Sequence, residues 1–112
     1  MDGAWFFQEG WDDMAKIVTT DFIRYFQGHK GKENAVYSRE IERHFGLIGT
    51  EVRELVNYLR TQGIPICSGV QGYWIAKNDE EVMSTLLNLM RRKKGLENAI
   101  EGMLNCIKVY EK

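Results

Sequence analysis

Glycines divide the middle of this 112-residue chain into short elements, and no other feature limits its fold as strongly. One amphipathic segment, residues 39–45, stops at Gly46, and glycine commonly ends a helix. A second segment, residues 50–62, begins with a candidate capping residue, Thr50, and stops at Gly63. Its apolar residues recur at helical spacing and predict one buried face; they are Val52, Leu55, Val56 and Leu59. Two helices with so short a connection predict a helix-turn-helix.

Two apolar runs follow the second predicted helix and flank a turn bounded by Gly69 and Gly72. The first run, residues 64–68, contains Pro65, which has no N–H group and therefore belongs at the beginning or the edge of a strand. The second run covers residues 73–76. This pattern predicts a two-stranded β-hairpin, and a helix-turn-helix followed directly by a hairpin is a winged helix.

Four stretches within these elements carry a family resemblance: REIERHFGL at 39–47, VRELVNYLR at 52–60, GIPI at 63–66 and GYWI at 72–75. They resemble the winged-helix module at the start of biotin repressors, and more closely the small winged-helix proteins encoded by bacteriophages and prophages. The resemblance spans about residues 36–78 and implies a fold whose second helix enters the major groove of DNA. The chain departs from the pattern at the hairpin tip, residues 69–72, which lacks the basic residue common in biotin-repressor-like wings.

Helical segments flank this central module on both sides. Apolar residues at steps of three and four predict a helix from about residue 12 to residue 27. On the other side, Asn78 with Glu81 three residues later is typical of a helix start. We therefore predict a mainly helical α+β fold: a winged helix-turn-helix with an N-terminal helical arm in residues 1–77 and a long C-terminal helical extension in residues 78–112, packed as one compact unit.

The C-terminal extension repeats apolar residues at alternating steps of four and three, with only Lys93 out of register. We call these residues the apolar seam and predict that they form the interface of a homodimer; they are Leu86, Leu89, Leu96, Ile100, Met103 and Ile107. Gly95 opens an alternative, because a glycine inside a helix costs about 1 kcal/mol relative to alanine. A break there would fold the extension into an antiparallel helix pair.

Polar residues on the outer face of the second predicted helix are candidates for reading DNA bases. Arginine, asparagine and glutamine can each form paired hydrogen bonds with a base edge, and threonine can form a single one. The predicted base-reading residues are Arg53, Asn57, Thr50 and Gln62. The predicted phosphate contacts are the basic residues nearby, namely Lys30, Lys32, Arg39, Arg60 and Lys77. Glu51 and Glu54 on the same helix oppose this role, because a carboxylate repels phosphate.

Composition excludes several other classes of protein. Fifteen Lys and Arg against sixteen Asp and Glu give a net charge of -1, so DNA binding would depend on a local basic patch. No apolar run of about 18 residues and no basic leader are present, and we expect a cytoplasmic protein without membrane contact. Cys67 and Cys106 lie far apart, which predicts two reduced, mostly buried thiols and neither metal nor cofactor. His29 and His44 have no partners at catalytic spacing, so an enzyme is not expected.

Two functions from different classes follow from these features. The first is a small DNA-binding protein, a dimeric phage-type regulator of transcription or replication that binds duplex DNA through residues 50–62. The alternative is a winged-helix adaptor that binds a protein partner and has no intrinsic affinity for DNA. The low net charge, the uncharged hairpin tip and the two glutamates of the second helix favour the adaptor.

Overall fold

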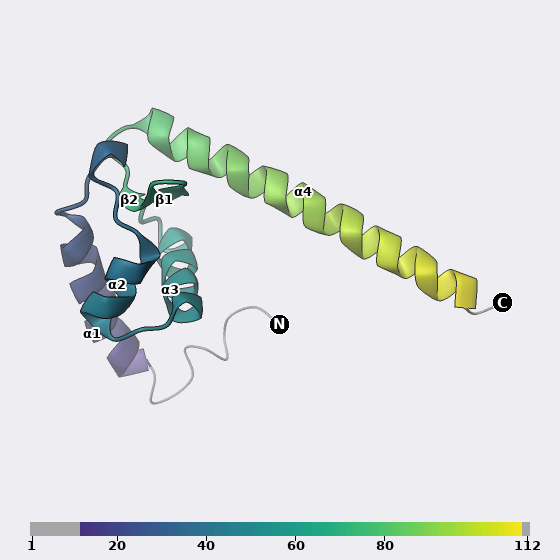
Figure 1. Cartoon of the computed structure of the whole chain (residues 1–112), viewed down its shortest axis with the longest axis horizontal. Coiled ribbons are helices and arrows are strands. Elements are labelled where there is room, and N and C mark those ends of the chain that lie inside the picture. Colours follow the sequence, from purple (N-terminus) through teal and green to yellow (C-terminus); the bar gives the residue numbers. More distant parts are fainter. Residues whose placement is uncertain (1–11, 111–112) are drawn as a thin grey trace. The chain divides into compact units, whose positions relative to one another are not determined.

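The computed structural model describes residues 12–110, with side chains from Thr19 to Ile107, and has a mainly helical α+β architecture (Figure 1). The elements in chain order are α1 (Asp12–Phe26), the short 3-10 helix η2 (Lys32–Asn34), α2 (Ser38–Phe45), α3 (Gly49–Thr61), β1 (Ile66–Gly69), β2 (Gly72–Ile75) and α4 (Asp79–Tyr110). The chain divides into two units, a first unit of Met1–Val82 and a second unit of Met83–Lys112. The boundary therefore lies inside α4, where the sequence had suggested one compact unit with an extension from residue 78.

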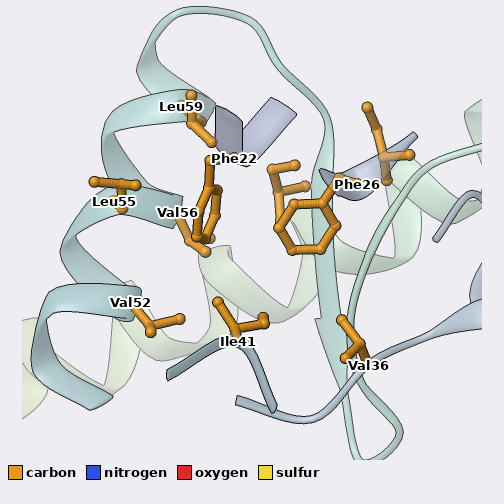
Figure 2. Close-up of a cluster of buried hydrophobic side chains, with 10 residues drawn as sticks. Phe22, Phe26, Val36, Ile41, Val52, Leu55, Val56 and Leu59 are labelled. Atoms are coloured by element: carbon orange, nitrogen blue, oxygen red, sulfur yellow. The ribbon is translucent and has the colours of Figure 1, made fainter. Parts of the chain in front are cut away.

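The core of the first unit gathers apolar side chains from the first three α-helices and from both strands. Phe22 and Phe26 of α1 lie with their ring centroids 5.1 Å apart. Figure 2 shows them facing the side chains of α3 and Ile41 of α2. The predicted buried face of α3 is confirmed, and the remaining members of the core come from the hairpin and the segment before α2: Val36, Ile66 and Ile75. Since α3 is anchored along one full face, its opposite face is held in a fixed position toward solvent.

A short turn connects α2 to α3. Gly46 ends α2 in the left-handed conformation at φ 67°, as the sequence predicts. The prediction that Thr50 caps α3 is wrong, because the N–H of Val52 donates to the carbonyl of Ile48 at 3.1 Å and α3 already begins at Gly49. Ile48 provides no side-chain cap, and the carboxylate of Glu51 reaches back to accept the N–H of Ile48 at 3.0 Å. Thr50 therefore lies within the first turn of the helix.

The hairpin forms as predicted, with Ile66 opposite Ile75 at its base and Gly69 opposite Gly72 at its turn. Val36 adds to the outer edge of β2, where it exchanges two backbone hydrogen bonds of 2.8 Å with Tyr73. Gly72 has a φ of 107°, and a Cβ atom at this position would collide with the carbonyl group of Val36. Only glycine fits this close approach.

Helix α4 is one continuous helix of 32 residues. Its start is confirmed, because the N–H of Glu81 donates to Asn78 Oδ1 at 3.0 Å. The helix runs through Gly95 and Gly102 without interruption, so the alternative of a break near Gly95 is wrong. None of the described helices is long and apolar enough to cross a lipid bilayer.

Candidate nucleic-acid interface

The outer face of α3 carries a polar strip at steps of three and four residues. Thr50, Arg53 and Asn57 are all exposed, and Arg53 Nη2 donates to Thr50 Oγ1 at 3.3 Å. The side chain of Asn57 forms no hydrogen bond with another described residue. At about 100° per residue the three side chains lie within about 60° of one another around the helix axis. The strip therefore presents hydroxyl, guanidinium and amide groups to one external surface.

Glu51 and Glu54 differ in how they affect this surface. The carboxylate of Glu51 holds the N–H of Ile48 and so serves the start of α3. Glu54 is partly buried. A negative charge near a helix N-terminus is favourable to the helix dipole, so Glu51 has a structural role that does not depend on any ligand.

Gln62 and Arg60 do not join the strip in the way their sequence positions suggest. Gln62 is exposed but follows the end of α3, about half a turn around the axis from Arg53, and its Nε2 donates to Thr61 Oγ1 at 3.3 Å. Arg60 is partly buried, and its side chain turns onto β1: Nε donates to the carbonyl of Ile66 at 2.7 Å and Nη2 to Ser68 Oγ at 3.1 Å. Arg60 thus ties α3 to the hairpin.

The other predicted phosphate contacts come from different elements. Lys30 and Lys32 are exposed at the base of the hairpin, where Lys30 pairs with the end of β2 through its backbone. Arg39 is exposed in the first turn of α2. Lys77 Nζ donates to both carboxylate oxygens of Glu33 at 2.9 and 3.0 Å. These lysines therefore lie beside β2 and the start of α4, and not on α2 or α3.

The Lys77–Glu33 pair shifts the titration of both groups. The hydrogen bond from Lys77 lowers the pKa of the Glu33 carboxyl, and the same bond raises the pKa of the Lys77 ammonium group. Both side chains remain about half exposed, so water and salt screen the attraction.

A cluster around Glu81 escaped the sequence analysis. Glu81 Oε1 accepts the indole N–H of Trp74 at 3.0 Å and the backbone N–H of Lys77 at 3.1 Å, and Oε2 accepts the backbone N–H of Lys32 at 3.0 Å. Burial acts to raise the pKa of this carboxyl, but the three N–H donors and the charge of Lys77 together hold it below its usual value. The spacing of Asn78 and Glu81 in the sequence predicts the helix cap, but it gives no indication that Glu81 also contacts η2 and β2.

The apolar seam on α4 is exposed to solvent along most of its length. Five of its six residues have exposed fractions between 44% and 68%, and Leu89 is partly buried. Five further large apolar residues of α4 are exposed: Val82, which extends the seam by one step of four, and Met83, Leu87, Met90 and Leu104, which were missed. Each of these four missed residues sits one position after a seam position, which widens the apolar surface on that side.

Other chemistry finds little support among the described residues. They contain no group of three histidine, cysteine or acidic side chains placed to hold a metal ion. Cys67 is buried as predicted, whereas the prediction is wrong for Cys106, which is exposed on α4 because that helix has no core around it. Comparison of the chain with protein-family models, with curated proteins and with solved structures gives no match.

Proposed function

We propose that this protein is a small winged-helix protein that binds duplex DNA by placing α3 in the major groove. The observation that carries the proposal is the strip of Thr50, Arg53 and Asn57 on the exposed face of a helix whose opposite face is fully anchored in the core. Base reading requires donors and acceptors held on a rigid element, and an arginine or asparagine that pairs with a base edge contributes about 1–3 kcal/mol of discrimination. The succession of α2, α3 and a hairpin also supports a winged helix.

Phosphate contacts would come from Lys30, Lys32 and Arg39, which are exposed, and from Lys77. The ion pair between Lys77 and Glu33 does not rule Lys77 out, because exposed ion pairs contribute only about 0–1 kcal/mol and can be exchanged for a phosphate. Arg60 is a weaker candidate, since releasing it from β1 would leave the carbonyl of Ile66 without this partner in the protein interior.

Dimer formation through the apolar seam of α4 completes the proposal. A single first unit has few cations near α3, and its affinity for DNA would be modest. Two copies joined through α4 bind two half-sites, and the second contact then occurs at a high effective concentration. A dimer of this kind fits a phage-type regulator of transcription or replication.

The experiment that tests DNA binding is fluorescence anisotropy with a labelled duplex of mixed sequence at about 50 mM salt. A DNA-binding protein retains affinity for any duplex in the micromolar range at low salt. We expect Lys32→Ala to weaken binding to all sequences and to reduce the log–log salt slope by about 0.9. Selection from a random duplex library should give Arg53→Ala a more relaxed consensus than the parent chain.

Arg24→Ala is the matched control, because it removes an equal charge from an exposed arginine of the same unit. It should change affinity less than twofold. If the parent chain fails to bind duplex at low salt, the DNA-binding proposal is wrong.

That result would favour the adaptor instead, and one observation supports this second candidate. Val70 at the hairpin tip is 92% exposed, and Tyr37 and Ile48 are exposed at the starts of α2 and α3. Burial of these apolar side chains against a partner protein would be favourable, because it removes their surface from water.

A further inference from the structure

The seam of α4 has a single charged interruption, and its position constrains how a second helix can cover it. In heptad terms, Val82, Leu89, Leu96 and Met103 occupy one seam position, and Leu86, Lys93, Ile100 and Ile107 occupy the other. Because α4 is one continuous helix (Figure 1), residues at this spacing lie along one of its faces. Lys93 is therefore the one charged residue among these eight that a partner helix would cover.

A second copy of the chain can cover the seam in two orientations with different consequences for Lys93. In a parallel pair each seam residue faces its own equivalent, so the two Lys93 ammonium groups would meet in the apolar layer. In an antiparallel pair the two seam positions face each other. Lys93 then faces an apolar residue of the second copy instead of its own equivalent. Like charges placed directly opposite each other are unfavourable, which disfavours the parallel pair.

We propose that α4 pairs antiparallel with α4 of a second copy, with the centre of the pair between Lys94 and Gly95. This register places Leu86 opposite Met103, and Leu89 opposite Ile100, of the second copy. Val82 then lies opposite Ile107, and Lys93 opposite Leu96. The midpoint of the helix Asp79–Tyr110 falls at the same place, so the two helices overlap along their whole length of about 48 Å.

The residues that flank the seam support the same register through their charge and polarity. In this register Lys93 faces Leu96 of the second copy, and Glu97 follows Leu96 directly, so each Lys93 lies beside Glu97 of the second copy. On the same flank Met83 meets Leu104 of the second copy, and both are more than half exposed in the single chain. A parallel pair would instead set Met83 beside the polar Asn78 region.

The inference deepens the dimer of the proposed function and does not depend on DNA binding. It is tested with two variants of the full chain that each add one cysteine, Leu86→Cys and Met103→Cys, in a Cys106→Ser background. In the antiparallel pair, two cysteines at position 86 lie about 25 Å apart, far beyond the reach of a disulfide, whereas positions 86 and 103 face each other. Cys67 is buried and remains in place.

The variants are oxidised in a glutathione buffer, alone and as a mixture, and the products are identified by mass. We expect each variant alone to remain largely uncrosslinked and the mixture to form the mixed disulfide in at least tenfold excess over either homodisulfide. Asn98→Cys, on the outer face of α4, is the control and should not crosslink in any combination.

A second measurement uses the charges, with dimer affinity followed by light scattering and sedimentation. Glu97→Lys should weaken the dimer at least tenfold, and the double exchange Lys93→Glu with Glu97→Lys should restore it. Homodisulfides of each single variant would overturn the antiparallel orientation while leaving the dimer intact. A monomeric mass for the parent chain, with no crosslink in any mixture, would overturn the dimer itself, and the anisotropy titrations decide DNA binding independently of both.

Discussion

Removal of the Glu81 carboxylate should destabilise the first unit by about 2–3 kcal/mol. The carboxylate accepts three N–H groups, and two of these belong to the backbone of exposed residues, Lys32 and Lys77, which water can solvate after the change. Water cannot solvate the indole N–H of Trp74 in the same way, because Trp74 is only 4% exposed. An orphaned buried donor costs about 1–3 kcal/mol, and the loss of two charge-assisted bonds adds a smaller amount.

Three variants separate the possible causes of that loss. Glu81→Ala removes every acceptor, whereas Glu81→Gln keeps one amide oxygen for Trp74 and should cost about half as much. Glu80→Ala is the matched control, because it removes a neighbouring acid from the same first turn of α4 and should cost at most about 0.5 kcal/mol.

The assay is urea unfolding followed by circular dichroism and tryptophan fluorescence, together with hydrogen exchange of the Trp74 indole proton measured by NMR. We expect a lower urea midpoint and a faster indole exchange in Glu81→Ala than in Glu80→Ala. If Glu81→Ala unfolds at the same midpoint as Glu80→Ala, and the indole proton keeps its protection, the carboxylate does not hold the hairpin to α4.

Three further predictions concern other contacts of the fold. Arg60→Ala should lower the stability of the first unit by about 1.5–3 kcal/mol in urea unfolding, because it removes both bonds to β1, and Arg60→Lys should recover less than half of this. Gly72→Ala should lower the free energy of unfolding by at least about 2 kcal/mol because the added methyl group collides with Val36. Gly95→Ala should raise the helicity of α4 and stabilise it by about 1 kcal/mol, since nothing lies near the added methyl group. Equal effects of the two substitutions on the thermal midpoint would contradict this prediction. The lowered pKa values of Glu33 and Glu81 mean that their ionised forms stabilise the fold at neutral pH, and this contribution should be lost as the pH falls below the ordinary glutamate value of about 4.3, with a flatter loss in Glu81→Gln.

The sequence was sufficient for the elements whose signal is local. The spacing of Val52, Leu55, Val56 and Leu59 predicts the buried face of α3, because helical periodicity alone decides which side of a helix meets the core. The sequence also predicts the end of α2 at Gly46 and the hairpin turn, since each depends on a residue type that fits a particular backbone conformation.

The contacts that escaped sequence reasoning join residues far apart in the chain. Lys32 and Glu81 are 49 positions apart, and no local pattern reveals that a helix-capping acid also reaches η2 and Trp74. The direction of Arg60 depends on where β1 lies beside α3, which helical spacing cannot supply. The start of α3 was misplaced because the residue before the helix is the apolar Ile48, which has no side-chain oxygen to mark a cap in the sequence.

Arg60 and Lys77 show why a count of basic residues overstates a DNA-binding surface. Arg60 donates to an uncharged carbonyl and a hydroxyl in a partly buried position. It could contact a phosphate only if both of these hydrogen bonds were broken. Lys77 faces an exposed carboxylate, and salt already weakens that pair, so a phosphate can replace Glu33 at little cost. Two residues of the same charge thus differ in availability because of their acceptors. With Arg60 committed to the fold, a single α3 surface retains Arg53 as its one arginine, which makes a second copy bound through α4 more important for affinity.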